Sequence, residues 1–203
     1  MIAIITGDII NSEKHQASEW LNTLKATFSK WGSSPQEWEI YRGDEFQIKI
    51  EPQKALWAAL EIKATMRSFK NLDVRMAIGI GAETYTGETV SESNGTAYHR
   101  SGRIFETLKE EKLNLAIATG ETQEDESMNL ILKMALDFMD QWTSVSAEIV
   151  TIVLANPQLT QKEIASQLNI QQSAVSQRQK RARLDLVQEL LAYYPKTLKR
   201  LEL

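Results

Sequence analysis

The first 120 residues alternate between short apolar runs and stretches with helical spacing. The opening "MIAIITGDII" (1–10) is almost wholly apolar and predicts a buried strand. "ASEWLNTLKATFSKWG" (17–32) then repeats apolar residues at helical spacing before Gly32. "EWEIYRGDEFQIKI" (37–50) alternates apolar and polar positions on both sides of Gly43 and predicts two short strands joined by a turn.

The next part of the chain repeats this order. "PQKALWAALEIKATMRSF" (52–69) predicts a helix with Pro52 in its first turn, and "LDVRMAIGIG" (72–81) predicts a strand. A polar, glycine-containing stretch leads to a helix around "RSGRIFETLKEE" (100–111), and "LNLAIATG" (113–120) predicts a last strand. The order β, α, β, β, α, β, followed by α and β, is the split βαβ pattern of a ferredoxin-like sheet with an added element. We therefore expect an α+β fold.

A run of acidic residues marks a change in the pattern. "ETQEDES" (121–127) has four acids and no apolar residue, and it predicts a domain boundary. Apolar residues then follow helical spacing as far as Trp142. This helix either connects two halves of the chain or packs against the sheet as an ordinary core-facing helix. We divide the chain into a sheet domain at 1–120, a connecting helix at 121–142 and an all-α domain at 143–203.

The all-α part contains the most specific local pattern, "LTQKEIASQLNIQQSAVSQRQKRA" (159–182). Thr160 and Glu163 have the spacing of a capping box, so a helix should begin there. Asn169 can adopt a left-handed turn, and a second helix should begin at about Gln172. Apolar residues at matching positions would form a small core: Ile164, Ala165, Leu168, Ile170 and Val175. The segment predicts a helix-turn-helix and resembles the core of bacterial regulators of that type.

The second helix of such a motif enters the major groove of DNA. Its early exposed residues carry amide and hydroxyl groups that can pair with base edges; these are Gln172, Ser173, Ser176 and Gln177. The cations that follow suit phosphate contacts, although a solvated helix face would look the same; these are Arg178, Lys180, Arg181 and Arg183. Gln179 departs from the pattern, because many such helices have an apolar core residue there.

Charge and composition support this division. Residues 157–203 contain eight Lys or Arg and four Asp or Glu, a balance of +4, whereas the whole chain carries −4, so the remainder carries −8. Double-stranded DNA should therefore meet the C-terminal quarter. The absence of cysteine excludes disulfides and thiolate metal sites and fits a cytoplasmic location. The N-terminus lacks a basic leader, and no apolar run approaches the roughly 18 residues of a membrane span.

Two carboxylates in the sheet domain predict a different chemistry. Asp8 lies near the end of the first strand, and Asp44 lies in the turn between the next two. If those strands are neighbours, the carboxylates can converge on a divalent cation that carries nucleotide phosphates. Magnesium (Mg²⁺) is the expected ion, because hard oxygen ligands are all that this pair offers. The alternative for Asp44 alone is a turn carboxylate that accepts backbone hydrogen bonds.

The segments "GDII" and "RGDEF" resemble the metal-binding aspartates of class III nucleotide cyclases and GGDEF domains, and the resemblance continues in "ESNGTAYHRSGR" (92–103). It implies a cyclase-type palm domain over roughly residues 1–120. By this resemblance Glu92 would recognise the base, while Gly43 and Gly95 would belong to the nucleotide site. Arg103 would stabilise the transferring phosphate. His99 stands where the family has asparagine, and Ile40 stands where it has an adenine-selecting lysine.

Over nearly its whole length the chain resembles the bacterial SatD family, which implies a cyclase-like domain joined to a helix-turn-helix. We expect a DNA-binding transcriptional regulator whose first domain senses a nucleotide with little or no turnover, because two positions of the cyclase pattern are substituted. Three alternatives remain. The chain could be a magnesium-dependent nucleotide cyclase or a nucleotidyl-transfer enzyme, in either case with a DNA-targeting module. In the third alternative, both halves of the chain mediate only protein contacts. In the enzyme readings His99 and Arg103 are the candidate catalytic residues.

The C-terminal segment predicts one more property. "LDLVQELLAYYPKTL" (184–198) places an apolar stripe on one face of a helix: Leu184, Val187, Leu190, Leu191 and Tyr194. Since dimeric helix-turn-helix proteins bind paired half-sites, a homodimer through this stripe is one reading. Packing of the stripe onto its own chain is the other.

Overall fold

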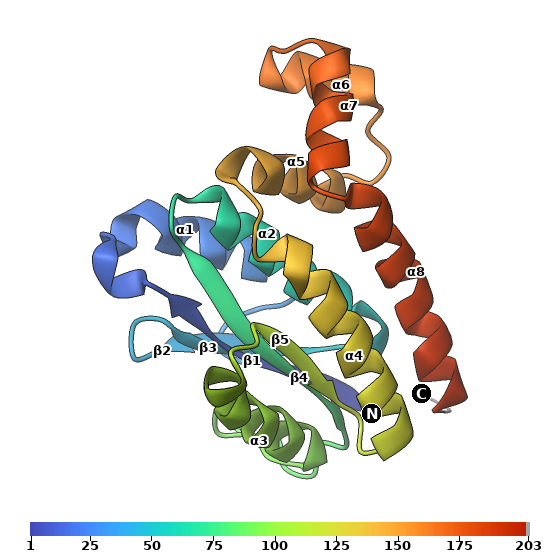
Figure 1. The fold of residues 1–203 in the computed structure, drawn as a ribbon. Coiled ribbons are helices and arrows are strands. Elements are labelled where there is room, and N and C mark those ends of the chain that lie inside the picture. Colours follow the sequence, from blue (N-terminus) through green and yellow to red (C-terminus); the bar gives the residue numbers. More distant parts are fainter. Residues whose placement is uncertain (202–203) are drawn as a thin grey trace.

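The computed structural model describes residues 1–201, and its fold is α+β, as the sequence predicts (Figure 1). The strands form one mixed sheet: β1 (Ile2–Ile10), β2 (Trp38–Tyr41), β3 (Glu45–Ile50), β4 (Asp73–Gly81) and β5 (Leu115–Ala118). The helices are α1 (Ala17–Phe28), α2 (Pro52–Ser68), α3 (Thr96–Glu111), α4 (Thr122–Met139), α5 (Ser144–Ala155), α6 (Gln161–Leu168), α7 (Gln172–Arg181) and α8 (Leu184–Arg200), with a short 3₁₀ helix, η1 (Ser12–Lys14).

The strand order of the sheet is β2-β3-β1-β4-β5. All neighbouring strands are antiparallel except β4 and β5, which are parallel. In this register Asp8 of β1 lies opposite Glu45 of β3 on one side and opposite Arg75 of β4 on the other. Because side chains alternate between the two faces of a sheet, these three residues share one face.

Helices cover both faces of the sheet (Figure 1). Ile5 and Ile9 of β1 are buried in the main cluster with residues of α1 and α2, whereas Ile4 is buried with Ala97 and Tyr98 of α3. Helix α3 crosses β4 closely: a Cβ atom on Gly79 would lie 2.2 Å from the carbonyl oxygen of Ala97. Only glycine permits this approach, so α3 is held tightly over the face that carries Asp8.

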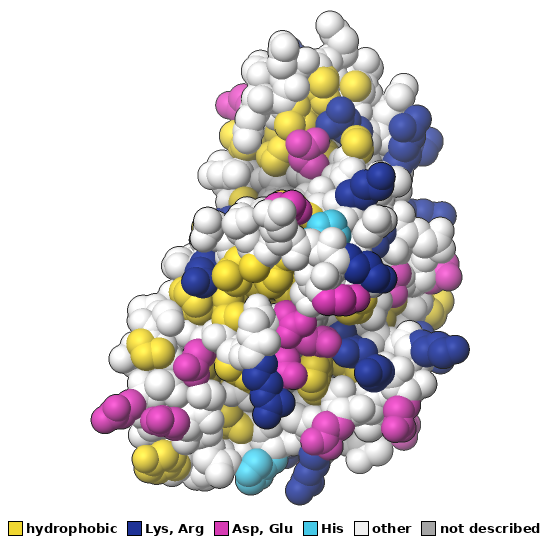
Figure 2. Space-filling view, turned by 90° about the vertical axis from the view of Figure 1, so that its left-hand side faces the viewer, with side chains coloured by type: hydrophobic (Ala, Val, Ile, Leu, Met, Phe, Trp, Pro, Cys, Tyr) yellow, Lys and Arg dark blue, Asp and Glu magenta, His cyan; other side chains and the backbone are white. Residues whose placement is uncertain are grey.

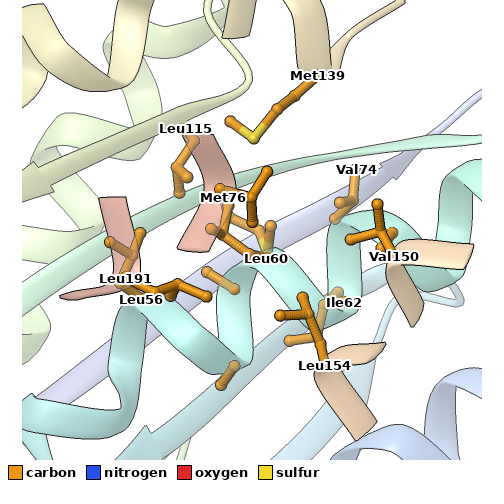
Figure 3. Packing of buried hydrophobic residues seen from close by; sticks show 14 of the residues in the cluster. Leu56, Leu60, Ile62, Val74, Met76, Leu115, Met139, Val150, Leu154 and Leu191 are labelled. Carbon is orange, nitrogen blue, oxygen red and sulfur yellow. The ribbon is translucent and has the colours of Figure 1, made fainter. Parts of the chain in front are cut away.

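Helix α2 is the centre of the hydrophobic core (Figure 3). Leu60 packs beneath the sheet with Met76, while Val150 and Leu154 of α5 approach α2 from the side away from the sheet. Most of α2 is buried, and its buried side chains are mostly apolar but include Glu61 and Lys63. One continuous core therefore joins the sheet to the C-terminal helices.

Helix α4 begins at Thr122, inside the acidic run where the sequence predicts a domain boundary. One face of α4 is buried in the same core: Met128, Leu132, Ala135, Leu136 and Met139. The helix thus packs as a core-facing element. The division into domains at 1–120, 121–142 and 143–203 stays a prediction, and the core is continuous across both boundaries.

Helices α6 and α7 project away from the sheet, whereas α5 packs on α2 and α8 runs back beside α4 (Figure 1). The Trp142 indole donates a hydrogen bond of 2.9 Å to the carbonyl of Ala182, which ties the end of α7 to the segment between α4 and α5. The predicted apolar stripe of α8 is buried inside its own chain, and the Tyr194 hydroxyl donates to the carbonyl of Pro52 at 2.8 Å. The stripe therefore packs onto its own chain, the second of the two readings.

Candidate functional site

The predicted capping box is present at the start of α6. Thr160 Oγ1 accepts a hydrogen bond from the Glu163 amide, and Glu163 Oε2 accepts one from the Thr160 amide at 2.7 Å. These hydrogen bonds, led by the one from the Thr160 backbone, hold the pKa of Glu163 below its ordinary value. Asn169 ends α6 in the left-handed conformation, with φ 52°. The turn between α6 and α7 is therefore built as the sequence predicts.

Helix α7 buries little except Val175, which is fully buried. The residues predicted to face DNA are exposed and form two pairs spaced one turn apart on this helix: Gln172 with Ser176, and Ser173 with Gln177. This row of amides and hydroxyls is open to solvent. Figure 2 shows Lys and Arg side chains along one side of the projecting part, which also carries some Asp or Glu side chains, and charges of both signs on the sheet part below.

The cations after this row differ in their surroundings. Lys180 and Arg181 are exposed, but Arg178 Nη1 lies 3.0 Å from Glu148 Oε2 of α5. Arg183 is exposed in the left-handed conformation before α8 and lines a groove between α4 and α8. Of the predicted phosphate contacts, Lys180 and Arg181 are therefore the most available, and Arg178 is engaged by an acid.

Three glutamines link the two helices by their side chains. Gln161, the first residue of α6, donates to Gln179 of α7 at 2.7 Å and accepts from Gln172 at 2.6 Å. This network explains why a glutamine can stand at position 179, where many such helices have an apolar core residue. The polar side chain of Gln179 lies at the contact of α6 and α7 and has a hydrogen-bond partner there in Gln161. The sequence contained all three residues, but nothing in their spacing predicted the pairing.

At the sheet, Asp8 is bound by a neighbouring strand. Arg75 Nε and Nη2 lie 3.1 Å and 2.5 Å from the two carboxylate oxygens of Asp8. The same guanidinium lies 5.7 Å from the ring centre of Phe105 on α3. A two-pronged pair of this kind is both strong and geometrically specific. Sequence patterns alone do not single out Arg75, because its position opposite Asp8 depends on the strand register.

Asp44 is close to the end of β1 but its carboxylate points to a different partner. Its carbonyl accepts from the Ile9 amide at 3.2 Å, and its Oδ2 accepts from the Ser12 hydroxyl at 2.5 Å. Asp8 thus lies on β1 and Asp44 lies in the turn before the neighbouring strand β3, while each carboxylate is already engaged. Within residues 1–201 no group of three or more acidic or histidine side chains is placed to hold a metal ion. The Asp8 carboxylate is paired with Arg75 and the Asp44 carboxylate with Ser12, and the magnesium site stays a prediction.

The remaining residues of the cyclase resemblance lie around α3. Gly95 precedes the helix with φ 152°, and a Cβ atom there would lie 2.2 Å from the Ala82 carbonyl oxygen, so the position requires glycine. Glu92 is exposed and accepts from the Glu88 amide at 3.2 Å. His99 and Arg103 are exposed and lie one turn apart on α3. Gly43 has φ 90° and open space around it, which suits the hairpin turn.

A polar cluster that the sequence did not predict lies elsewhere on this face of the sheet. Glu83 accepts hydrogen bonds from Tyr98 at 2.7 Å and from Lys49 at 3.2 Å. Burial opposes ionisation of Glu83, but these hydrogen bonds outweigh it and lower its pKa. Burial, followed by the bond to Glu83, raises the pKa of Tyr98. A hollow of about 410 Å³ beside Glu83 and Lys49 is also lined by Lys54 of α2 and by charged residues of the connecting segments: Lys30, Glu37 and Glu51.

The family model of the SatD family matches residues 1–189. The chain belongs to the SatD family. A comparison with curated proteins gave no match, and neither did a comparison with solved structures. In this SatD family member, no helix among the described residues is long and apolar enough to cross a membrane.

Proposed function

We propose that this SatD family protein is a DNA-binding transcriptional regulator in which α6 and α7 form a helix-turn-helix. The observation that carries the proposal is the exposed row on α7, which follows a capped α6 and precedes two free cations. Amide and hydroxyl groups in such a row suit base edges, and Lys180 and Arg181 suit phosphates.

The glutamine network supports a specific mode of reading. Glutamine reads adenine with both its oxygen and its nitrogen in the major groove. Gln161 accepts from the Gln172 amide nitrogen and so fixes the orientation of a side chain that would otherwise rotate freely. We propose that Gln172 is the principal base contact, with Gln161 as its positioning residue, and that Ser173, Ser176 and Gln177 make further contacts along the groove.

We propose in addition that the sheet domain is a cyclase-type palm that senses a nucleotide. The order β2-β3-β1-β4 is that of a ferredoxin-like sheet, and β5 is the added strand. The nucleotide would lie near Asp8, Asp44 and Gly43, with Glu92, Gly95 and Arg103 contributing from the loop and helix after β4. Arg75, which neutralises Asp8, supports binding without turnover, because the carboxylate is not free to hold a catalytic cation. Formation of cyclic nucleotide from ATP or GTP would favour the enzyme alternative.

A mobility assay over genomic DNA fragments at low salt tests the DNA proposal. The variant Lys180→Ala/Arg181→Ala should bind all DNA sequences more weakly. The slope of the logarithm of its affinity against the logarithm of the salt concentration should become shallower by about one unit for each phosphate contact that is lost. Lys25→Ala/Lys109→Ala, which removes two exposed cations from α1 and α3, is the matched control and should leave binding unchanged. Absence of binding by the wild-type protein would overturn the proposal.

Selection from randomised DNA tests the reading mode separately. Gln172→Ala and Gln161→Ala should lose the same base preference, because one removes the side chain that reads the base and the other removes its orientation. Gln167→Ala, an exposed glutamine of α6 outside the network, is the control. An unchanged preference in Gln161→Ala would overturn the role of Gln161 and leave DNA binding itself untouched.

A further inference from the structure

Helices α4 and α8 enclose an apolar groove of about 730 Å³ that no part of the proposed function uses. The two helices run in opposite directions, since Arg200 at the end of α8 pairs with Glu124 at the start of α4 at 2.7 Å. Apolar side chains from both helices line the groove: Ile131, Ala135, Phe138, Leu186, Leu190 and Tyr193. An apolar groove between two helices is a common binding site for a third helix.

Large hydrophobic side chains stand exposed on the same surface. Met134 on α4 is 68% exposed and lines the groove, and Leu130, one turn earlier on α4, is 60% exposed. Leu186 on α8 is 36% exposed. These account for three of the six large hydrophobic residues that are exposed among residues 1–201. Exposed apolar side chains clustered beside an apolar groove are typical of an interaction surface.

The charges around the groove indicate what kind of partner fits. Asp137 lies at the end of the groove near Phe138, whereas Lys196 lies near Tyr193 at the opposite end, and Arg183 and Glu189 complete a balanced set. A strongly acidic partner would be repelled by Asp137 and Glu189, and a strongly basic partner would be repelled by Arg183 and Lys196. A twofold symmetric contact places the same patch on both sides, so an acid at one end can meet a base at the other.

We propose that a second copy of this chain docks on the groove between α4 and α8, forming a twofold dimer. In this dimer the exposed Met134 of each chain enters the groove of the other. Asp137 of each chain faces the Lys196 position of the other across the twofold axis. The groove adjoins the buried stripe of α8 and shares Leu190 with it, and the inference does not depend on whether the protein binds DNA.

The dimer would fix the spacing of the two α7 helices. Helix α8 follows α7 after Arg183, and the Trp142–Ala182 hydrogen bond ties the end of α7 to the segment that follows α4. Both walls of the groove are therefore attached to the projecting helices. A dimer held there would present two copies of the exposed row on α7 as a single unit.

Light scattering at tens of micromolar tests the proposal on the full chain. The wild-type protein should give twice the chain mass of 23.0 kDa. Met134→Glu/Leu186→Glu should dimerise more weakly by on the order of tenfold or more, because a charge in an apolar contact removes its central packing. Val145→Glu, at a 44% exposed site on α5 outside the groove, is the matched control and should leave the dimer intact.

A charge exchange tests the geometry. Asp137→Lys should weaken the dimer, and Asp137→Lys/Lys196→Asp should restore it, whereas an interface formed elsewhere would not respond to the second change. Because all the altered side chains are exposed, melting temperatures close to that of the wild type should accompany each result. A wild-type monomer overturns the proposal, and so does a dimer that persists in Met134→Glu/Leu186→Glu. In the monomer case, binding of an apolar dye that Met134→Glu/Leu186→Glu abolishes would assign the groove to a small ligand instead.

Discussion

Lys63 Nζ lies 2.6 Å from Asp140 Oδ1, and this contact joins the fully buried face of α2 to the end of α4. The same ammonium lies 2.9 Å from Asp73 at the start of β4. Arg67 approaches Asp73 at 3.8 Å, so two cations and two anions form one cluster around the fully buried Lys63. Lysine is almost never fully buried unless it is paired in this way. The cluster sits where the sheet meets the segment that leads to the C-terminal helices.

Replacement of Lys63 by methionine should destabilise the protein strongly. Methionine fills the space of the lysine stem but leaves the buried Asp73 and the 33% exposed Asp140 without their main partner. Breaking a buried pair typically costs about 3–5 kcal/mol, and the exposure of Asp140 places the expected loss toward the lower end. Urea unfolding, extrapolated to water, would measure the loss. Lys54→Met, which removes an exposed ion pair with Glu51, should cost less than about 1 kcal/mol. Equal stabilities of the two variants would contradict a stabilising role for the cluster.

The sequence predicted the elements well because most of them follow simple periodicities. The alternation around Gly43 predicted β2 and β3, and the spacing of Thr160 and Glu163 predicted the start of α6. These features are local, so a single stretch of chain contains all the information they need.

Pairings across the fold were not predictable in the same way. Arg75 meets Asp8 only because β4 lies beside β1 in a particular register, and the sequence does not state that register. From the sequence, a lysine in a helix is expected to be exposed to solvent, but Lys63 of α2 is buried. Its partners are on β4 and at the end of α4. The magnesium hypothesis treated Asp8 as free because the sequence does not show its cationic neighbour.

The capping box of α6 should depend on pH. The Thr160 hydrogen bonds lower the pKa of Glu163 in the folded protein. Their contribution to the stability of the fold is therefore fully present above the pKa of glutamate in the unfolded chain, about 4.3. It is lost as the pH falls through the lowered folded pKa. The Thr160 amide signal in NMR should therefore shift with a midpoint below the usual glutamate value. In Glu163→Gln, which cannot ionise, that shift should be absent; a midpoint at or above the usual value would contradict the cap.

Magnesium binding should be limited by Arg75. A guanidinium and a divalent cation compete for the same carboxylate, so Arg75→Gln should bind magnesium more tightly than the wild-type protein in calorimetry. Asp44→Asn, added to Arg75→Gln, should remove the gain if both aspartates hold the ion. Arg42→Gln also removes one cation beside the hairpin, from a side chain that is 79% exposed, and controls for the general loss of positive charge. Identical binding by all these proteins would exclude a magnesium site at Asp8 and Asp44.

Glu148 should restrain DNA binding through its ion pair with Arg178. The pair holds the Arg178 guanidinium toward α5, 3.0 Å from the acid, and away from any phosphate beside α7. Glu148→Gln frees this cation and removes a negative charge near the proposed interface. Binding at low salt should become tighter, and the slope of affinity against salt should steepen by about one phosphate contact. Titrations of one DNA fragment at several salt concentrations would measure both effects.

Two further variants separate this explanation from a general charge effect. Glu126→Gln makes the same charge change at an exposed site on α4 and should leave the slope unchanged. Glu148→Gln/Arg178→Ala should return the slope to the wild-type value, because the freed cation is then missing. If Glu148→Gln/Arg178→Ala keeps the steeper slope, the gain comes from removal of the carboxylate alone, and Arg178 does not contact phosphate.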